Sequence, residues 1–134
     1  MTNISDLRSG LATNLATISG LRTSVDLPDN PNPPVAVIGI ENVNYDQAFA
    51  GGLVEYNFRV TVLASRASDR MAQRRLDTYT STETGSVKLA IESDKTLGGK
   101  AFDVRVTEMS NIGTVSLGEI SYLAADFTVT VYAD

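Results

Sequence analysis

The sequence predicts an α+β domain, in which an antiparallel β-sheet of about four strands carries an N-terminal helix and two further helices on one face. Two observations predict this fold class. Three segments alternate apolar and polar residues with a period of two, so each strand has one dry face and one wet face. Three other segments have the apolar spacing or the capping residues of helices. Strands of this one-sided kind are typical of antiparallel sheets whose apolar face is covered.

The length of 134 residues, with 43% hydrophobic and 20% charged residues, suits one core, so we expect a single domain over residues 1–134. No apolar run approaches the roughly 20 residues that cross a bilayer. Residues 1–10 lack the apolar core of a signal peptide. We therefore expect a soluble protein with no membrane segment and no secretion by that route.

Charge and residue types narrow the function classes. A formal net charge of -5 disfavours a protein that grips phosphate backbones, because such binding needs an excess of Lys and Arg. The chain has no cysteine and no histidine, which removes disulfides, thiolate metal sites and the commonest general base. We expect no catalytic residue, no metal and no cofactor, and hence a protein that is not an enzyme.

The first element is a helix predicted over residues 2–19 and ended by Gly20. Its apolar residues recur every three or four positions and form one stripe: Ile4, Leu7, Leu11, Leu15 and Ile18. Residues 21–27 have two interpretations, a short strand or an extended connector. The proline-rich residues 28–34 predict a stiff extended arm, and residues 35–40 a short strand that is covered on both faces or shared with a neighbouring copy.

The strongest strand signal covers residues 54–64, where every even position is apolar and polar residues fill most odd positions. The same alternation predicts strands over 101–108 and 122–132. We expect Phe58, Val104 and Val129 on the buried face. Residues 110–118 are polar and contain glycine, which predicts a mobile hairpin tip between the last two strands.

Two helices are predicted between these strands. Ser68 is a good N-cap for a helix to about Ser81 that buries Ala72, Leu76 and Tyr79. Ser86 caps a shorter helix over 86–93 that buries Val87, Ala90 and Ile91. Ser86 and Lys88 are too few residues for a Ser-Lys nucleophile, so we interpret Lys88 as solvated. Two acidic pairs lie beside turn signals and are better explained as turn residues than as catalysts: Glu92 with Asp94, and Asp26 with Asp29.

Arginine recurs every four residues at Arg66, Arg70 and Arg74, with Arg75 nearby, and we expect this stripe on the exposed face of the helix over 68–81. Guanidinium groups bind carboxylates in a planar, bidentate manner, so the stripe suits a carboxylate-rich partner. An equally weighted interpretation is a solvated face partly paired with Asp69 and Asp77.

The connection over residues 41–52 is long for a hairpin, and loops of this length are often functional. It contains Tyr45, Asp46 and Phe49, which we take as candidate interface residues. In the alternative interpretation, Tyr45 and Phe49 fold onto the core of their own domain.

Five segments spread over most of the chain carry a family likeness. They are Pro33-Pro34-Val35-Ala36-Val37-Ile38, Tyr45-Asp46-Gln47-Ala48-Phe49, residues 58–70 (FRVTVLASRASDR), Leu76-Asp77-Thr78-Tyr79 and Leu97-Gly98-Gly99. Together they resemble the tail terminator, or tail completion, proteins of long-tailed actinobacterial phages. These motifs are structural rather than chemical.

The resemblance implies a structural virion protein at the head-proximal end of the tail, assembled in the host cytoplasm. It implies a homo-oligomeric ring, a hexamer, that sits on the last ring of tail tube protein, stops polymerisation and offers its other face to the head-tail connector protein. DNA would pass through the lumen without specific binding. Two alternatives remain: a stopper or adaptor protein of the phage neck, and, more remotely, a small-molecule enzyme.

Overall fold

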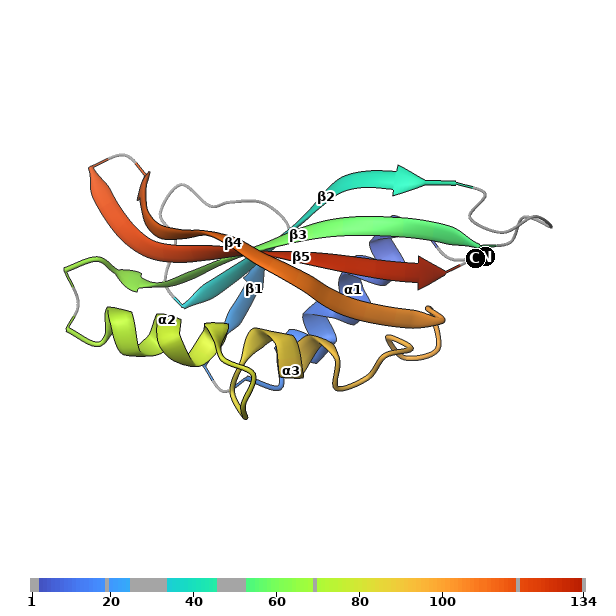
Figure 1. Ribbon diagram of the computed structural model, residues 1–134, viewed down its shortest axis with the longest axis horizontal. Coiled ribbons are helices and arrows are strands. Elements are labelled where there is room, and N and C mark those ends of the chain that lie inside the picture. The colour runs from blue at the N-terminus through green and yellow to red at the C-terminus, as the bar shows by residue number, and fades with distance from the viewer. Residues whose placement is uncertain are drawn as a thin grey trace.

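The computed structural model describes residues 3–18, 20–24, 34–45, 53–68, 70–117 and 119–133. In this part of the chain, three helices and five strands follow one another (Figure 1). Their order is α1 (Ile4–Leu15), β1 (Arg22–Ser24), β2 (Val35–Asn44), β3 (Val54–Arg66), α2 (Ala72–Thr80), α3 (Val87–Ile91), β4 (Asp103–Leu117) and β5 (Ile120–Ala133). The predicted α+β class is confirmed.

The strands form one sheet in the order β1-β2-β3-β5-β4. β2, β3, β5 and β4 pair antiparallel, as predicted. The short strand β1 adds a fifth strand that runs parallel to β2, with Arg22 opposite Val35. The sheet is therefore mixed, and the first of the two interpretations of residues 21–27 is correct for Arg22–Ser24.

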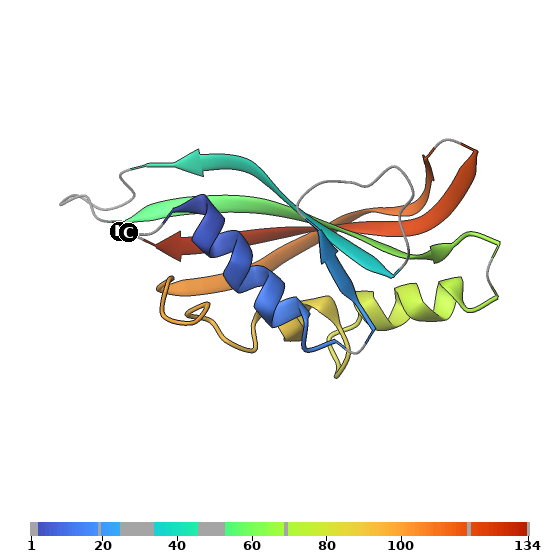
Figure 2. The same ribbon diagram turned by 180° about the vertical axis from the view of Figure 1, so that it is seen from behind.

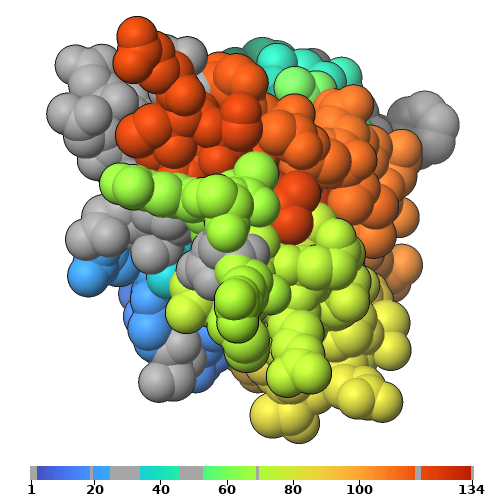
Figure 3. Space-filling view, turned by 90° about the vertical axis from the view of Figure 1, so that its left-hand side faces the viewer, coloured from blue at the N-terminus to red at the C-terminus, as the bar shows by residue number. Residues whose placement is uncertain are grey.

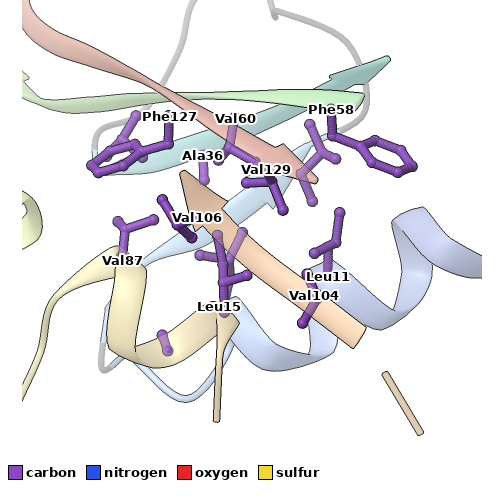
Figure 4. Packing of buried hydrophobic residues seen from close by; sticks show 14 of the residues in the cluster. Leu11, Leu15, Ala36, Phe58, Val60, Val87, Val104, Val106, Phe127 and Val129 are labelled. Carbon is purple, nitrogen blue, oxygen red and sulfur yellow. The ribbon is translucent and has the colours of Figure 1, made fainter. Parts of the chain in front are cut away.

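The core lies between the sheet and the helices, which cover the same face (Figures 1 and 2). Phe58, Val104 and Val129 are fully buried, as the alternation predicts. Leu11 and Leu15 of α1 point toward these strand residues (Figure 4). Burying a side chain of this size stabilises a fold by about 1.5–3 kcal/mol, which explains why the strand pattern was so clear in the sequence.

A second, smaller apolar cluster lies on the other face of the sheet, near the start of β2. It consists of Val35, Leu63, Tyr122 and Ala124, with Val115 and Ile120 packed against it. Leu63 belongs here because its neighbours Val62 and Ala64 point into the main core and side chains alternate along a strand.

Helix boundaries differ from the prediction in all three helices. α1 ends at Leu15, because Ala16 closes it and the Thr17 hydroxyl donates to the Asn14 carbonyl. α2 begins at Ala72 rather than after Ser68, and its cap residue Met71 makes no side-chain capping bond. The Ala67 N–H donates to the Ser121 carbonyl at 2.8 Å, which holds the chain beside β5 before the helix can begin.

α3 follows the prediction more closely. The Ser86 hydroxyl accepts a hydrogen bond from the Leu89 N–H at 3.1 Å and caps the helix, and Val87, Ala90 and Ile91 are buried. α3 is shorter than predicted, because it ends at Ile91. Ala72, Leu76 and Tyr79 of α2 are also buried as predicted.

The prediction of a mobile tip over 110–118 is wrong for residues 110–117, which continue β4. The pairing of β4 with β5 shifts between Ser110 and Gly113, where Asn111 has φ 52° and Gly113 has φ 155°. An extra residue at such a bulge interrupts the alternation of side chains and so hides the strand in the sequence.

Candidate assembly surfaces

The arginines gather at one end of the molecule rather than along one helix. Arg66 is the last residue of β3, Arg70 lies in the turn that follows, and only Arg74 and Arg75 belong to α2. The predicted helical stripe is therefore wrong, because a spacing of four residues makes one face only where the chain is helical. All four side chains are exposed. Figure 3 views this end, with the segment from β3 to α2 in yellow-green below the orange β4–β5 hairpin.

The charges at this end are not neutralised by carboxylates within the described residues. No carboxylate there lies within ion-pair distance of Arg66, Arg70 or Arg74. Asp77, predicted as a partner, accepts instead from the Gln73 amide at 2.9 Å, and Asp69 lies outside the described residues. Three cationic side chains are thus available to an acidic partner.

An open groove of about 450 Å³ runs beside these arginines. Its lining combines apolar and cationic groups: Ile18, Met71, Arg74, Arg75, Thr78, Tyr79 and Gly85. Arg75 donates to the Ser65 hydroxyl at 2.8 Å, which holds its side chain against the end of β3. Burial raises the pKa of Tyr79, against the opposing effect of Arg75. A groove of this chemistry suits an apolar anchor flanked by acidic residues.

Of the predicted loop residues, the structure describes only Tyr45. Its side chain is 71% exposed, so it does not fold onto the core of its own domain. Asp46 and Phe49 lie outside the described residues, as do residues 28–33 of the predicted proline-rich arm. Strand β2 continues to Asn44, which shortens the connection predicted over residues 41–52.

The sheet face opposite the helices carries a ladder of hydrogen-bonded polar side chains. At one end of the ladder, the Glu55 carboxylate accepts three hydrogen bonds: from Asn44 at 2.6 Å, from Asn57 at 3.3 Å and from the Tyr132 hydroxyl at 3.2 Å. Asn57 also donates to Asn42 at 2.8 Å and accepts from Thr130 at 2.9 Å. Neighbouring strands thus supply partners for one another across the whole width of this face.

The ladder continues along the strands with charged groups. Thr61 and Asn111 donate to the two oxygens of Asp126 at 2.7 and 2.9 Å. Two arginines beside the ladder are each paired with a carboxylate, Arg59 with Glu41 and Arg105 with Asp103. By register, Arg22 opposite Val35 and Arg66 opposite Tyr122 also belong to this face, at its other end. Glu55, Glu108 and Asp126 have no cationic partner among the described residues, so the part of the face around the ladder is net acidic, while Arg66 lies at the far end of β3.

Hydrogen bonding favours the ionised form of Glu55. The bond from Asn44, with smaller contributions from Asn57 and Tyr132, lowers the pKa of Glu55 below its ordinary value of 4.5. Burial raises the pKa of Tyr132, and the nearby charge of Glu55 adds to that shift. At neutral pH Glu55 therefore presents a negative charge that accepts hydrogen bonds already supplied by the protein.

At the outer edge of β4, two side chains from α3 and its C-cap form hydrogen bonds with the main-chain groups of Val106. Lys88 donates to the Val106 carbonyl at 3.3 Å, and Glu92 accepts from the Val106 N–H at 3.0 Å. Lys88 and Glu92 also bind each other at 2.5 Å. The Lys88 side chain, predicted as solvated, is 42% exposed and in addition has these two partners. Burial alone would raise the pKa of Glu92, but the bonds from Lys88 and Val106 outweigh it and leave the pKa below 4.5.

The other acidic residues that we weighed as catalysts behave as turn residues where the structure describes them. Asp94 accepts from the Thr96 hydroxyl, the Thr96 N–H and the Gly98 N–H, which lowers its pKa. It thus closes the turn after α3, as predicted, while Asp26 and Asp29 lie outside the described residues. The described residues contain no group of three or more carboxylates placed to bind a metal ion. Among the described helices, none is both long and apolar enough to span a membrane.

No protein-family model matches the chain, and no curated protein matches it significantly.

Proposed function

We propose that this chain is a structural virion protein that forms a ring, of six copies, on the head-proximal end of a phage tail tube. The ring stops polymerisation of the tube, joins it to the head connector and lets DNA pass through its lumen. One observation carries the proposal: a sheet with one helix-covered face exposes on its other face a net acidic, internally hydrogen-bonded surface. The resemblance to tail terminator proteins leads to the same function from the sequence.

The acidic face suits the wall of a DNA channel. DNA carries about one negative charge per 1.7 Å of its axis, so a wall of fixed carboxylates repels it. A free arginine on the wall would bind phosphate; the two arginines beside the ladder, Arg59 and Arg105, are paired with carboxylates, and Arg66 lies at the far end of β3. The side chains already bond one another, so they offer few unsatisfied donors to a passing phosphate.

The arginine end suits the contact with the tube. A growing tube of identical rings presents the same adhesive surface after each addition, so a cap must satisfy that surface without recreating it. Arg66, Arg70 and Arg74 provide charge that steers an acidic partner surface and excludes wrong partners. The adjacent groove beside Tyr79 provides apolar area, which supplies most of the affinity in interfaces of this kind.

The experiment removes the protein from an infection. We expect filled heads beside headless tails that are overlong or unfinished, because nothing stops the tube. The triple variant Arg66→Glu, Arg70→Glu, Arg74→Glu should give the same tails while its thermal unfolding stays close to that of the wild type, since all three side chains are exposed. Lys95→Glu is the matched control, because Lys95 is exposed in the turn after α3 and away from this end.

Two outcomes contradict the proposal. Tails of normal length joined to heads in the absence of the protein would show that it neither caps nor joins. Tails that stop at normal length but fail to join heads would instead support the neck stopper or adaptor role.

A further inference from the structure

The outer edge of β2 is open along most of its length. β1 pairs only with Val35–Val37, so residues 38–44 have no strand neighbour on that side among the described residues. A row of main-chain donors and acceptors at a sheet edge is a template for another strand.

A hollow of about 210 Å³ lies beside this open edge, between α1 and the end of β1. Its lining is rich in donors: Ser5, Arg8 and Ser9 from α1, Thr23 and Ser24 from β1, and Ile38 from β2. The Arg8 Nε–H is buried and has no hydrogen-bond partner among the residues that the structure describes. A buried, unpaired guanidinium N–H is unfavourable, so it marks a place where an acceptor is missing. An added strand running past Ser24 would bring carbonyl oxygens over this hollow.

The opposite edge of the sheet, β4, is also without a strand neighbour among the described residues. There, however, Lys88 and Glu92 occupy both main-chain groups of Val106. Pairing at Val106 would have to displace that ion pair, so the open part of this edge is the stretch beyond it, residues 109–117.

Strand directions decide how two such edges can meet. β2, β3, β5 and β4 alternate in direction, so β2 and β4 run in opposite directions within one copy. If one copy is placed beside the next in the same orientation, β2 of one meets β4 of the other antiparallel, and the alternation continues without a break. Because the two edges are different surfaces, this contact is head to tail, the kind of contact that builds a ring when the rotation between copies closes.

We propose that residues 38–44 of β2 pair antiparallel with residues 109–117 of β4 in a second copy of this chain, with Arg8 of the first copy donating to the incoming strand. This inference rests on the ring of the proposed function and specifies its subunit contact. Gly39 lies level with Glu108 across the sheet through Arg59 and Thr128, so the two open stretches are offset along the strands. Closing a sheet into a barrel requires such a stagger between its edges.

Arg8→Met tests the hollow. The substitution keeps most of the side-chain volume and removes the unpaired donor, so the single domain should unfold at the same temperature as the wild type or higher. Ring formation, measured by native mass at several concentrations, should weaken by about tenfold, which corresponds to the loss of one hydrogen bond to a charged group. Arg8→Lys, which keeps a donor, should assemble better than Arg8→Met. If Arg8→Met assembles as the wild type does, the proposed contact is wrong.

Engineered disulfides test the pairing directly, because the chain has no cysteine and each new thiol is unique. Four double variants combine Gly39→Cys or Asn42→Cys on β2 with Ser110→Cys or Val115→Cys on β4. All four positions belong to the same face of the sheet by their register, and a Cβ at Gly39 meets only the Arg59 carbonyl at an ordinary 3.8 Å. The control pairs Gly39→Cys with Glu83→Cys, an exposed position in the turn before α3.

After oxidation, we expect at least one double variant to give a series of disulfide-linked oligomers that ends at the full ring. Under denaturing, non-reducing conditions the four single variants and the control should run as monomers without a covalent link. Dimers from a single variant would mean that like edges meet, and no such series from any double variant would mean that these strands do not pair; either result overturns the inference. Rings by native mass without the linked series would leave the proposed function standing. A linked series combined with normal tails in the absence of the protein would leave the strand contact standing and refute the function.

Discussion

The two faces of the sheet are made by the same strands and are stabilised in different ways. On the helix side, Phe58 and Val129 are completely removed from water and belong to one continuous core. On the other side, the residues that follow them in sequence, Arg59 and Thr130, take part in an ion pair and a hydrogen bond, and Arg59 is exposed whereas Thr130 is buried. Alternate residues of one strand therefore serve different purposes: one set stabilises the fold, and the other sets the charge of a surface.

This difference explains why the helix side was predictable. The stabilisation that a buried side chain contributes scales with its own apolar area. A strand with one buried face therefore carries an apolar residue at every second position of the sequence. A ladder of polar side chains depends on which strands are neighbours, and that information is non-local: Asn57 meets Thr130 across 73 positions of sequence.

The largest expected effect is the difference in unfolding free energy between a substitution on the buried face and one on the open face. Phe58→Ala should lower the free energy of unfolding by about 3–5 kcal/mol, because it removes a fully buried ring and leaves a cavity. Arg59→Ala, its neighbour on the open face, should lower it by less than about 1 kcal/mol, because exposed ion pairs contribute little. Denaturant unfolding of the two variants measures both. Similar losses would mean that the open face stabilises the fold as much as the core does.

A smaller effect is a loss of folding stability in acid, to which two carboxylates at the sheet contribute because their pKa values are lowered in the folded protein. Glu55 and Glu92 both have folded pKa values below 4.5, so they bind fewer protons folded than unfolded. Their contribution to stability is complete above the unfolded value and is lost as the pH falls from about 4.5 through the folded pKa. We expect stability to decline over that window. It should change little from pH 6 to pH 8, because the chain has no histidine that would titrate there.

Variants assign that acid loss to its sources. Glu92→Gln should reduce stability at neutral pH by about 1 kcal/mol, because it keeps an acceptor for Val106 but loses the charge that binds Lys88. It should also flatten the decline below pH 4.5, and Glu55→Gln should flatten it less, because its partners are more exposed. Unfolding midpoints measured from pH 3 to pH 8 give both slopes. If the variant that combines Glu92→Gln with Glu55→Gln loses stability in acid as steeply as the wild type does, other groups cause the acid destabilisation.

Much of the fold was predictable because its signals are local. The alternation in residues 54–64 predicted β3, and the Ser86 cap predicted the start of α3. β1 could not be assigned, because its three residues are too few to show a period and its partner begins at Val35. The end of β4 was missed because the bulge at Asn111 interrupts the alternation.

The candidate surfaces were predictable in part. The exposure of the arginines followed from their charge, but their arrangement did not, because α2 begins only at Ala72. Two features depend entirely on tertiary contacts: the Lys88–Glu92 pair at the main chain of Val106, and the buried Arg8 nitrogen. A spacing of four between Lys88 and Glu92 predicts an ion pair on a helix, yet nothing near them in sequence identifies Val106 as their common partner.

The smallest expected effect tests whether the ladder acts as a unit. Thr130→Val keeps the shape of the side chain and removes the hydroxyl that donates to Asn57 at 2.9 Å. One neutral hydrogen bond contributes about 0.5–1.5 kcal/mol, and the strand preference of valine offsets part of that loss, so we expect less than about 1 kcal/mol. Asn57→Ala removes three bonds at once and should cost more. A double-mutant cycle between the two positions measures their coupling by denaturant unfolding. Coupling above about 0.5 kcal/mol would show that strands β3 and β5 hold each other's polar groups in place. Strict additivity would mean that each side chain is held by water as well as by its neighbour, and the open face would then be a set of independent pairs.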